Sequence, residues 1–162
     1  IVKSLNLFSR SNESSSEDCD LHLIIDDCLM VLQHKHKDRI EIKKSYTDSD
    51  VRIKGNNGKL HQTFLNLLSN SMDAVEMNGK IDIETKSKEN SIIIQITDNG
   101  SGIREDHLEK VLDPFFTTKP PGTGTGLGLS IAHSIIEEHG GNLSLQSKAD
   151  QGTTALVKLP QK

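Results

Sequence analysis

The 162-residue sequence has no tryptophan, one tyrosine and four phenylalanines. These five aromatic side chains are the whole supply of rings for stacking on nucleic-acid bases. Positive charge is also scarce, since 19 basic residues against 23 acidic ones leave a net charge of −4. Phosphate backbones attract basic surfaces, so the composition argues against a nucleic acid as the main partner.

Cysteines and long apolar runs are scarce as well. Cys19 and Cys28 have neither metal-ligand spacing nor a second pair, which favours reduced thiols over a disulfide framework. No apolar run approaches the ~20 residues that cross a bilayer, and the N-terminus has no signal-peptide pattern. We therefore expect this chain to be cytoplasmic and to make no membrane contact, although the parent protein could still be anchored in a membrane.

The length suits one domain with its own core. Apolar residues at helical spacing predict the end of a helix over residues 1–10, and a serine-rich polar stretch predicts a linker over 11–19. The domain proper is predicted to span 20–162.

Hydrophobic periodicity predicts the elements of this domain, and Asp20 is a candidate N-cap for its first helix. The sequence "SKEN" predicts a hairpin turn between the third and fourth strands. Helices are predicted over 21–32, 58–77 and 127–139, and strands over 39–46, 51–54, 80–86, 91–98, 142–148 and 153–159.

The helix over 58–77 has two stripes. One is apolar, and the opposite stripe carries Asn66, Asn70 and Asp73 at steps of four and three residues. Short amides and a carboxylate offer oxygen atoms at fixed reach, and such oxygens can bind a hard cation such as Mg²⁺. Helix caps and solvated polar residues are the alternative interpretation of this stripe.

Asp98 follows an isoleucine-rich strand and falls on its apolar face, because strand side chains alternate with period two. A carboxylate buried there without a partner would cost several kcal/mol, so we expect a protein or ligand donor beside it. Gly100 and Gly102 follow at once and would let a bulky ligand approach the backbone.

Six of the twelve glycines lie in the stretch "DPFFTTKPPGTGTGLGLSIAHSIIEEHGG", residues 113–141. The part over 117–126 lacks periodicity and has the composition of a mobile lid. The free N–H groups at the start of a helix form an anion site, and glycines in front of it let the backbone approach phosphate oxygens closely. The stretch therefore predicts a phosphate site.

Together, the segments "NLLSNSMDA", "DNGSGI", "DPFFTTK" and "GTGLGLSI", followed by "HGG" and "GT", resemble the N, G1, F, G2 and G3 boxes of sensor histidine kinases. These kinases belong to the GHKL superfamily, with gyrase, MutL proteins and heat-shock ATPase chaperones. The resemblance covers about residues 20–160. It implies an α/β fold of the Bergerat type, an α+β two-layer sandwich in which about three helices cover one face of a mixed five-stranded sheet.

The resemblance also implies roles for single residues. Asp98 would accept the adenine N6 amine, Asn70 would ligate Mg²⁺, and Asn66 would support the same polar wall. Lys119 is our own suggestion for a cation that reaches the terminal phosphate. The predicted catalytic residues are Asn66, Asn70 and Lys119, and the predicted ATP-binding residues are Asn70, Asp73, Asp98, Gly100, Gly102, Ile103, Phe116, Thr117, Thr118, Lys119, Gly122, Gly124, Thr125, Gly126, Leu127, Gly128, Leu129 and Thr153.

The function implied is transfer of the γ-phosphoryl group of Mg-ATP to a histidine on a separate dimerisation domain of the same homodimeric parent, with a response regulator downstream. None of the seven histidines has the sequence context of the phosphoacceptor. Many histidine kinases also carry Lys, Arg or an aromatic residue where this chain has Asp73 and Ala74. The usual positive helper from that helix is therefore missing.

Two alternatives stay open at this point. GHKL ATPases place a glutamate, the base that activates water, four residues before the Mg²⁺ asparagine, and this chain has the neutral amide of Asn66 there. Efficient hydrolysis is therefore not expected. A non-catalytic, nucleotide-gated interaction module is the other alternative.

Overall fold

The computed structural model describes residues 16–114, 116 and 127–161. The predicted helix over 1–10 and the glycine-rich lid over 117–126 lie outside the described residues.

The main sheet is mixed and has five strands in the order β2-β4-β5-β7-β6. β2 runs parallel to β4, and the other neighbouring pairs are antiparallel. β5 is therefore the central strand. The strands are β2 (Ile40–Ser45), β4 (Gly79–Lys88), β5 (Ser91–Asp98), β6 (Asn142–Ser147) and β7 (Thr153–Pro160).

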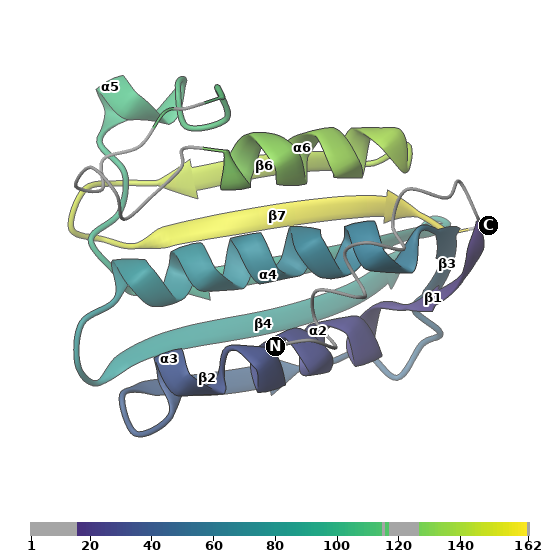
Figure 1. The fold of residues 1–162 in the computed structure, drawn as a ribbon, viewed down its shortest axis with the longest axis horizontal. Helices are drawn as coiled ribbons and strands as arrows, with labels where there is room; N and C mark the ends of the chain where they lie inside the picture. The colour runs from purple at the N-terminus through teal and green to yellow at the C-terminus, as the bar shows by residue number, and fades with distance from the viewer. Residues whose placement is uncertain (1–15, 115, 117–126, 162) are drawn as a thin grey trace.

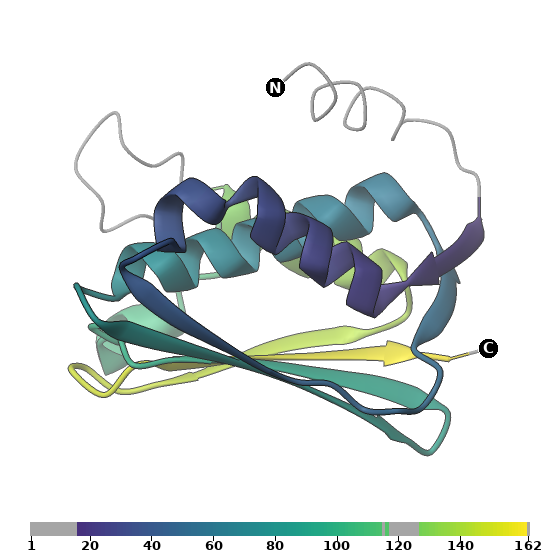
Figure 2. The same ribbon diagram turned by 90° about the horizontal axis from the view of Figure 1, so that it is seen from below.

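The long helices all lie on one face of this sheet, as Figure 2 shows. They are α2 (Leu21–Val31), α4 (Asn57–Ala74) and α6 (Gly128–Glu138), and α4 runs between the other two (Figure 1). Two short helices, α3 (Gln33–His36) and α5 (Glu105–Leu108), lie in connections. The predicted fold class is confirmed. None of the helices in the described ranges has the length and apolar character of a bilayer span.

The core lies between the helices and the sheet. Phe64 and Leu68 on α4 and Ile83, Ile94 and Val157 on the strands have no exposed surface. The apolar stripe of α4 faces this layer, so its polar stripe faces away from the sheet.

A second, two-stranded sheet joins β1 (Glu17–Asp20) to β3 (Arg52–Gly55) in antiparallel pairing. The linker predicted over 11–19 is therefore wrong for its last three residues. They pair with β3 as a strand, and Cys19 is 1% exposed and belongs to the core. The predicted strands 39–46 and 51–54 both form, but they belong to different sheets.

The helix and turn signals agree with the structure at most element ends. Asp20 caps α2, since its Oδ1 accepts hydrogen bonds from the backbone nitrogens of His22 and Leu23 at 3.0 and 3.3 Å. The hairpin between β4 and β5 turns on Glu89 and Asn90, with φ of 52° and 59°. The loop therefore has two residues of left-handed backbone, the geometry that matches strand twist.

The helix predicted over 58–77 ends earlier, at Ala74. Val75 has extended backbone, with φ −95° and ψ 148°. The guanidinium of Arg39 donates to the carbonyl oxygens of Met72 at 2.7 Å and Val75 at 2.8 Å. These bonds satisfy carbonyls that a helix C-terminus leaves without intrahelical partners.

Candidate nucleotide site

Asp98 ends the central strand β5 and is 5% exposed. Its Oδ1 accepts hydrogen bonds from the backbone nitrogens of Gly100 at 2.9 Å and Thr153 at 3.3 Å. The hydroxyl of Ser71 on α4 also donates to the carboxylate. The predicted buried carboxylate therefore exists, and protein donors fix its orientation.

Burial raises the pKa of Asp98, and the hydrogen bonds from Gly100, Thr153 and Ser71 act in the opposite direction. Desolvation is the larger of these effects, so the charged form of Asp98 is destabilised in the folded protein. The three hydrogen bonds offset part of that destabilisation. A buried acceptor with a perturbed pKa is typical of a functional position.

Glycines line the backbone next to Asp98. A Cβ atom on Gly100 would collide with the carbonyl oxygen of Ala74 at the end of α4. Gly102 and Gly152 have φ of +69° and +85°, and a Cβ atom on either would collide with a backbone carbonyl, that of Lys148 or Asp98. The glycines therefore permit close packing of the loop after β5 against α4 and the β6–β7 turn.

The amide stripe of α4 faces the start of α6. The Nδ2 of Asn66 donates to the carbonyl oxygen of Gly128, the first residue of α6, at 3.1 Å. Asn70 follows one turn along the same helix and is partly exposed. The predicted polar wall and the predicted phosphate-binding helix thus lie side by side.

Metal-binding groups are few in this region. Among the described residues, no three side chains of the types His, Cys, Asp and Glu come together as a metal site. Mg²⁺ is commonly held by one or two protein oxygens together with substrate phosphates. The amide oxygen of Asn70 is an oxygen of this kind.

Asp73 makes a contact that the sequence did not indicate. Its Oδ1 accepts a hydrogen bond from the Nζ of Lys35 on α3 at 2.9 Å. The same ammonium donates to the hydroxyl of Ser69 at 2.8 Å. A cation therefore lies beside the amide stripe although α4 itself does not provide one there.

The remaining predicted site residues fall into two groups. In the first, the backbone nitrogen of Ile103 donates to the Ser147 hydroxyl at 2.7 Å, and the ring of Phe116 meets that of His107 edge-on at 5.3 Å. Leu127 precedes α6, and Leu129 packs against the core. The second group lies outside the described residues: Thr117, Thr118, Lys119, Gly122, Gly124, Thr125 and Gly126.

Sequence reasoning missed Ser71, Ser147 and Lys35. Ser71 is 7% exposed and lies toward the apolar side of α4, so a small polar residue in an apolar stripe was the available signal. Ser147 donates to the carbonyl oxygen of Gly152 at 2.9 Å and contacts the hydroxyl of Thr153 at 2.7 Å. No local pattern connected Lys35 to Asp73, because 38 positions separate them.

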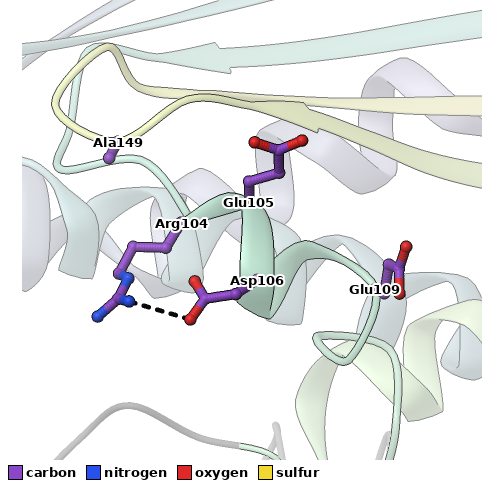
Figure 3. A pocket seen from close by; sticks show the side chains of 5 residues that line it. All are labelled: Arg104, Glu105, Asp106, Glu109 and Ala149. Carbon is purple, nitrogen blue, oxygen red and sulfur yellow. Dashed lines mark hydrogen bonds and ion pairs between the residues drawn. The ribbon is translucent and has the colours of Figure 1, made fainter.

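An open pocket of about 540 Å³ lies elsewhere, beside α5. Figure 3 shows it lined by Glu105, Asp106 and Glu109, by Ala149 opposite, and by Arg104. Arg104 is paired with Asp106 at 3.0 Å. Three carboxylates and one paired cation would repel a triphosphate, so the lining of this pocket does not suit the phosphates of a nucleotide.

Residues 55–162 match the family model of histidine kinase-, DNA gyrase B- and HSP90-like ATPases. The chain belongs to this ATPase family. Within it, this domain is of the sensor histidine kinase type, as the order of its boxes implied. It is 42% identical over 115 residues to sporulation kinase B of Bacillus subtilis, an alignment that covers 70% of this chain and 26% of the relative.

Other relatives agree. The domain is 32% identical over 176 residues to the sensor kinase CckA of Brucella abortus, covering 99% of this chain and 19% of CckA. The solved catalytic domain of the histidine kinase ThkA superposes with a TM-score of 0.80 at 30% identity, covering 91% of this chain and 96% of that one. The domain spans only about a fifth to a quarter of these curated relatives.

Proposed function

We propose that this domain binds Mg-ATP and donates the γ-phosphoryl group to a histidine on a separate dimerisation domain of the same cytoplasmic-facing, homodimeric parent. The observation that carries the proposal is the buried carboxylate of Asp98 at the end of β5, which accepts hydrogen bonds from Gly100, Thr153 and Ser71.

Asp98 supports the choice of adenine. Its Oδ1 accepts the two backbone hydrogen bonds, and the two oxygens of a carboxylate together offer further lone pairs for an exocyclic amine. Adenine presents such an amine, whereas guanine presents a carbonyl oxygen at the same edge. That oxygen would face a carboxylate, and two acceptors without a proton between them repel.

Asn70 and the start of α6 support the placement of the phosphates. The first N–H groups of a helix attract anions, and Gly128 opens α6 beside Asn66. Mg²⁺ bound to Asn70 and the phosphates would neutralise charge on the transferring group. The lid residues predicted over 117–126, with Lys119, would complete the site.

In the transfer step, a ring nitrogen of the acceptor histidine attacks the γ-phosphorus. The bond to the bridging oxygen of ADP breaks, and ADP leaves with that electron pair. Positioning of the two groups does most of the work in such reactions. The structure of ThkA, 26% identical to this chain, has been solved with the response regulator TrrA. By analogy we propose a response regulator as the final acceptor.

Hydrolysis of ATP by this domain is the less favoured function. Asn66 occupies the position of a catalytic base, but its side chain is a neutral amide whose Nδ2 already donates to Gly128. An amide cannot take a proton from water at pH 7. Slow phosphate release without an acceptor is therefore expected.

The test is incubation of the chain with labelled ATP, Mg²⁺ and the dimerisation domain of its parent. We expect label on that domain that is stable to base and labile to acid, as phosphohistidine is. Nucleotide binding without labelling of a competent acceptor would contradict kinase function and favour an interaction module. Rapid phosphate release without the acceptor would favour an ATPase.

A further inference from the structure

Lys35 lies on the one-turn helix α3, far from the sequence motifs of the nucleotide site. Its Nζ is 2.9 Å from Oδ1 of Asp73 and 2.8 Å from Oγ of Ser69, both on α4. The two side chains of the ion pair are about one-third exposed, at 30% for Lys35 and 33% for Asp73. The ammonium therefore stands at the edge of solvent and is not locked in the core.

The backbone that carries Lys35 is fixed independently of this ion pair. Arg39 donates from Nε to the carbonyl oxygen of Lys35 at 3.0 Å. Its two terminal nitrogens hold the carbonyl oxygens of Met72 and Val75 at the end of α4. One guanidinium thus ties α3 to the C-terminal turn of α4 and sets the starting point of the lysine side chain.

The position of Asp73 on α4 brings the ammonium to the amide stripe. At about 100° per residue, Asp73 lies about 60° around the helix from Asn70 and about 20° from Asn66. Side chains three or four residues apart on a helix are neighbours. The Asp73 and Asn70 side chains are therefore neighbours, and the ammonium held by Asp73 lies beside the amide stripe.

The charges of the described site call for such a cation. Its wall consists of two neutral amides, Asn66 and Asn70, and two carboxylates, Asp73 and Asp98. A bare Asp73 would repel a triphosphate. Among the ion pairs between described residues, Lys35–Asp73 is the one that contains a residue of the predicted ATP site.

We propose that Lys35 is a phosphate-binding residue of this domain, a cation that α3 supplies and that Asp73 and Ser69 hold ready beside the amide stripe. The proposal rests on the proposed nucleotide function. When nucleotide binds, the ammonium bridges Asp73 and the terminal phosphates. Asp73 and Ser69 take two of its three N–H donors, and the third donates to a phosphate oxygen.

The test measures binding of Mg-ATP, Mg-ADP and adenosine to the chain by calorimetry, with the variants Lys35→Gln and Lys35→Arg. Hydrogen bonds to charged groups are among the strong ones, so we expect Lys35→Gln to weaken ATP binding roughly tenfold and to change adenosine binding by less than about twofold. Lys35→Arg should restore most of the ATP affinity.

A charge relocation sharpens the test. Lys35→Ala combined with Asp73→Lys moves the cation from α3 to α4 and should recover ATP affinity relative to Lys35→Ala alone. The matched control is Lys44→Ala, because Lys44 pairs with Asp26 at 3.0 Å on another part of the surface. That variant should bind ATP as the unmodified chain does.

The outcomes separate the two proposals. Failure of the unmodified chain to bind ATP would overturn the proposed function. ATP binding that is unchanged in Lys35→Gln would overturn the role of Lys35 and leave the function standing. Equal losses for ATP and adenosine would also overturn it, because they would show that Lys35 only supports the structure of α4.

Discussion

His139 Nε2 lies 3.0 Å from the backbone nitrogen of Asn56 and accepts its hydrogen bond. The other ring nitrogen, Nδ1, donates to the carbonyl oxygen of Ile135 at 2.7 Å. A Cβ atom on Gly55 would lie 2.5 Å from Cδ2 of the ring, so the neighbouring strand packs closely against it. The imidazole therefore joins the C-terminal end of α6 to the N-terminal end of α4. These two helices also carry residues of the predicted phosphate site at their other ends.

Replacement of His139 by alanine should lower the free energy of unfolding by about 2 kcal/mol, since two hydrogen bonds and a packed ring are lost. Urea denaturation followed by circular dichroism measures this. His133 is the matched control: it is 29% exposed and lies 3.5 Å from Glu137 on the same helix. His133→Ala should change the free energy by less than about 0.5 kcal/mol, and equal effects of the two variants would contradict the fastening role.

Asp98→Asn should stabilise the nucleotide-free protein and weaken its binding of ATP. Burial raises the pKa of Asp98, so the folded state binds a proton here more readily than the unfolded chain does. The stabilisation that Asp98 contributes is thus fully present below the ordinary pKa of an aspartate and is lost as pH rises through the raised pKa. At neutral pH the amide of the variant carries no charge, so its burial does not destabilise the folded state as burial of the charged carboxylate does.

Thermal unfolding at pH 7 should therefore show a higher melting temperature for Asp98→Asn without nucleotide, while calorimetry should show weaker adenosine binding. The gain in melting temperature should shrink at acidic pH. A variant that binds adenosine normally would contradict the adenine role of Asp98.

Gly102→Ala and Gly128→Ala should have opposite consequences although both glycines belong to predicted nucleotide motifs. Gly102 has φ +69°, and a Cβ atom there would collide with the carbonyl oxygen of Lys148. At Gly128, a Cβ atom would meet the side chain of Asn66 only at an ordinary 3.7 Å. We expect Gly102→Ala to lower the free energy of unfolding by about 2 kcal/mol and Gly128→Ala to leave it unchanged or slightly raised.

Chemical denaturation of the two variants tests this contrast. A stable Gly102→Ala protein would mean that the loop after β5 can move away from the β6–β7 turn.

The protein should lose stability in mild acid through His22. Burial lowers the pKa of this imidazole, which stacks on Tyr46 at 4.1 Å and lies 2.8 Å from the Thr85 hydroxyl. The folded state therefore resists protonation. As pH falls through the interval between the ordinary histidine pKa and the lowered one, the unfolded chain takes up the proton and stability decreases.

The free energy of unfolding of the unmodified protein should thus fall as pH drops below the ordinary histidine pKa of about 6.5, with a smaller fall in His22→Gln. Parallel pH profiles for the two proteins would assign the acid sensitivity to another group.

Several features could be predicted because they depend on neighbours in the sequence. The buried direction of Asp98 follows from strand alternation, and the cap at Asp20 follows from the preference of a carboxylate for the first N–H groups of a helix. The end of α4 could not be predicted in the same way. It depends on Arg39, which is distant in the sequence and satisfies the carbonyl oxygens of Met72 and Val75.

The strand over residues 17–20 shows a similar limit. Its sequence, "EDCD", is as polar as a linker, and it forms a strand because β3 offers backbone partners and the core takes up Cys19. Pairing of this kind depends on what the rest of the chain places alongside.

By itself, the sequence determined most of the helices and strands, the apolar layer and the buried direction of Asp98, since periodicity and local hydrogen bonding act over a few positions. Only the tertiary structure decided which side chains stand beside them: Ser71 at Asp98, the His139 ring at Asn56, and the Lys35 ammonium at Asp73. The physical reason is that charges and hydrogen-bond donors act through distances in space, and folding brings together groups that the chain keeps far apart.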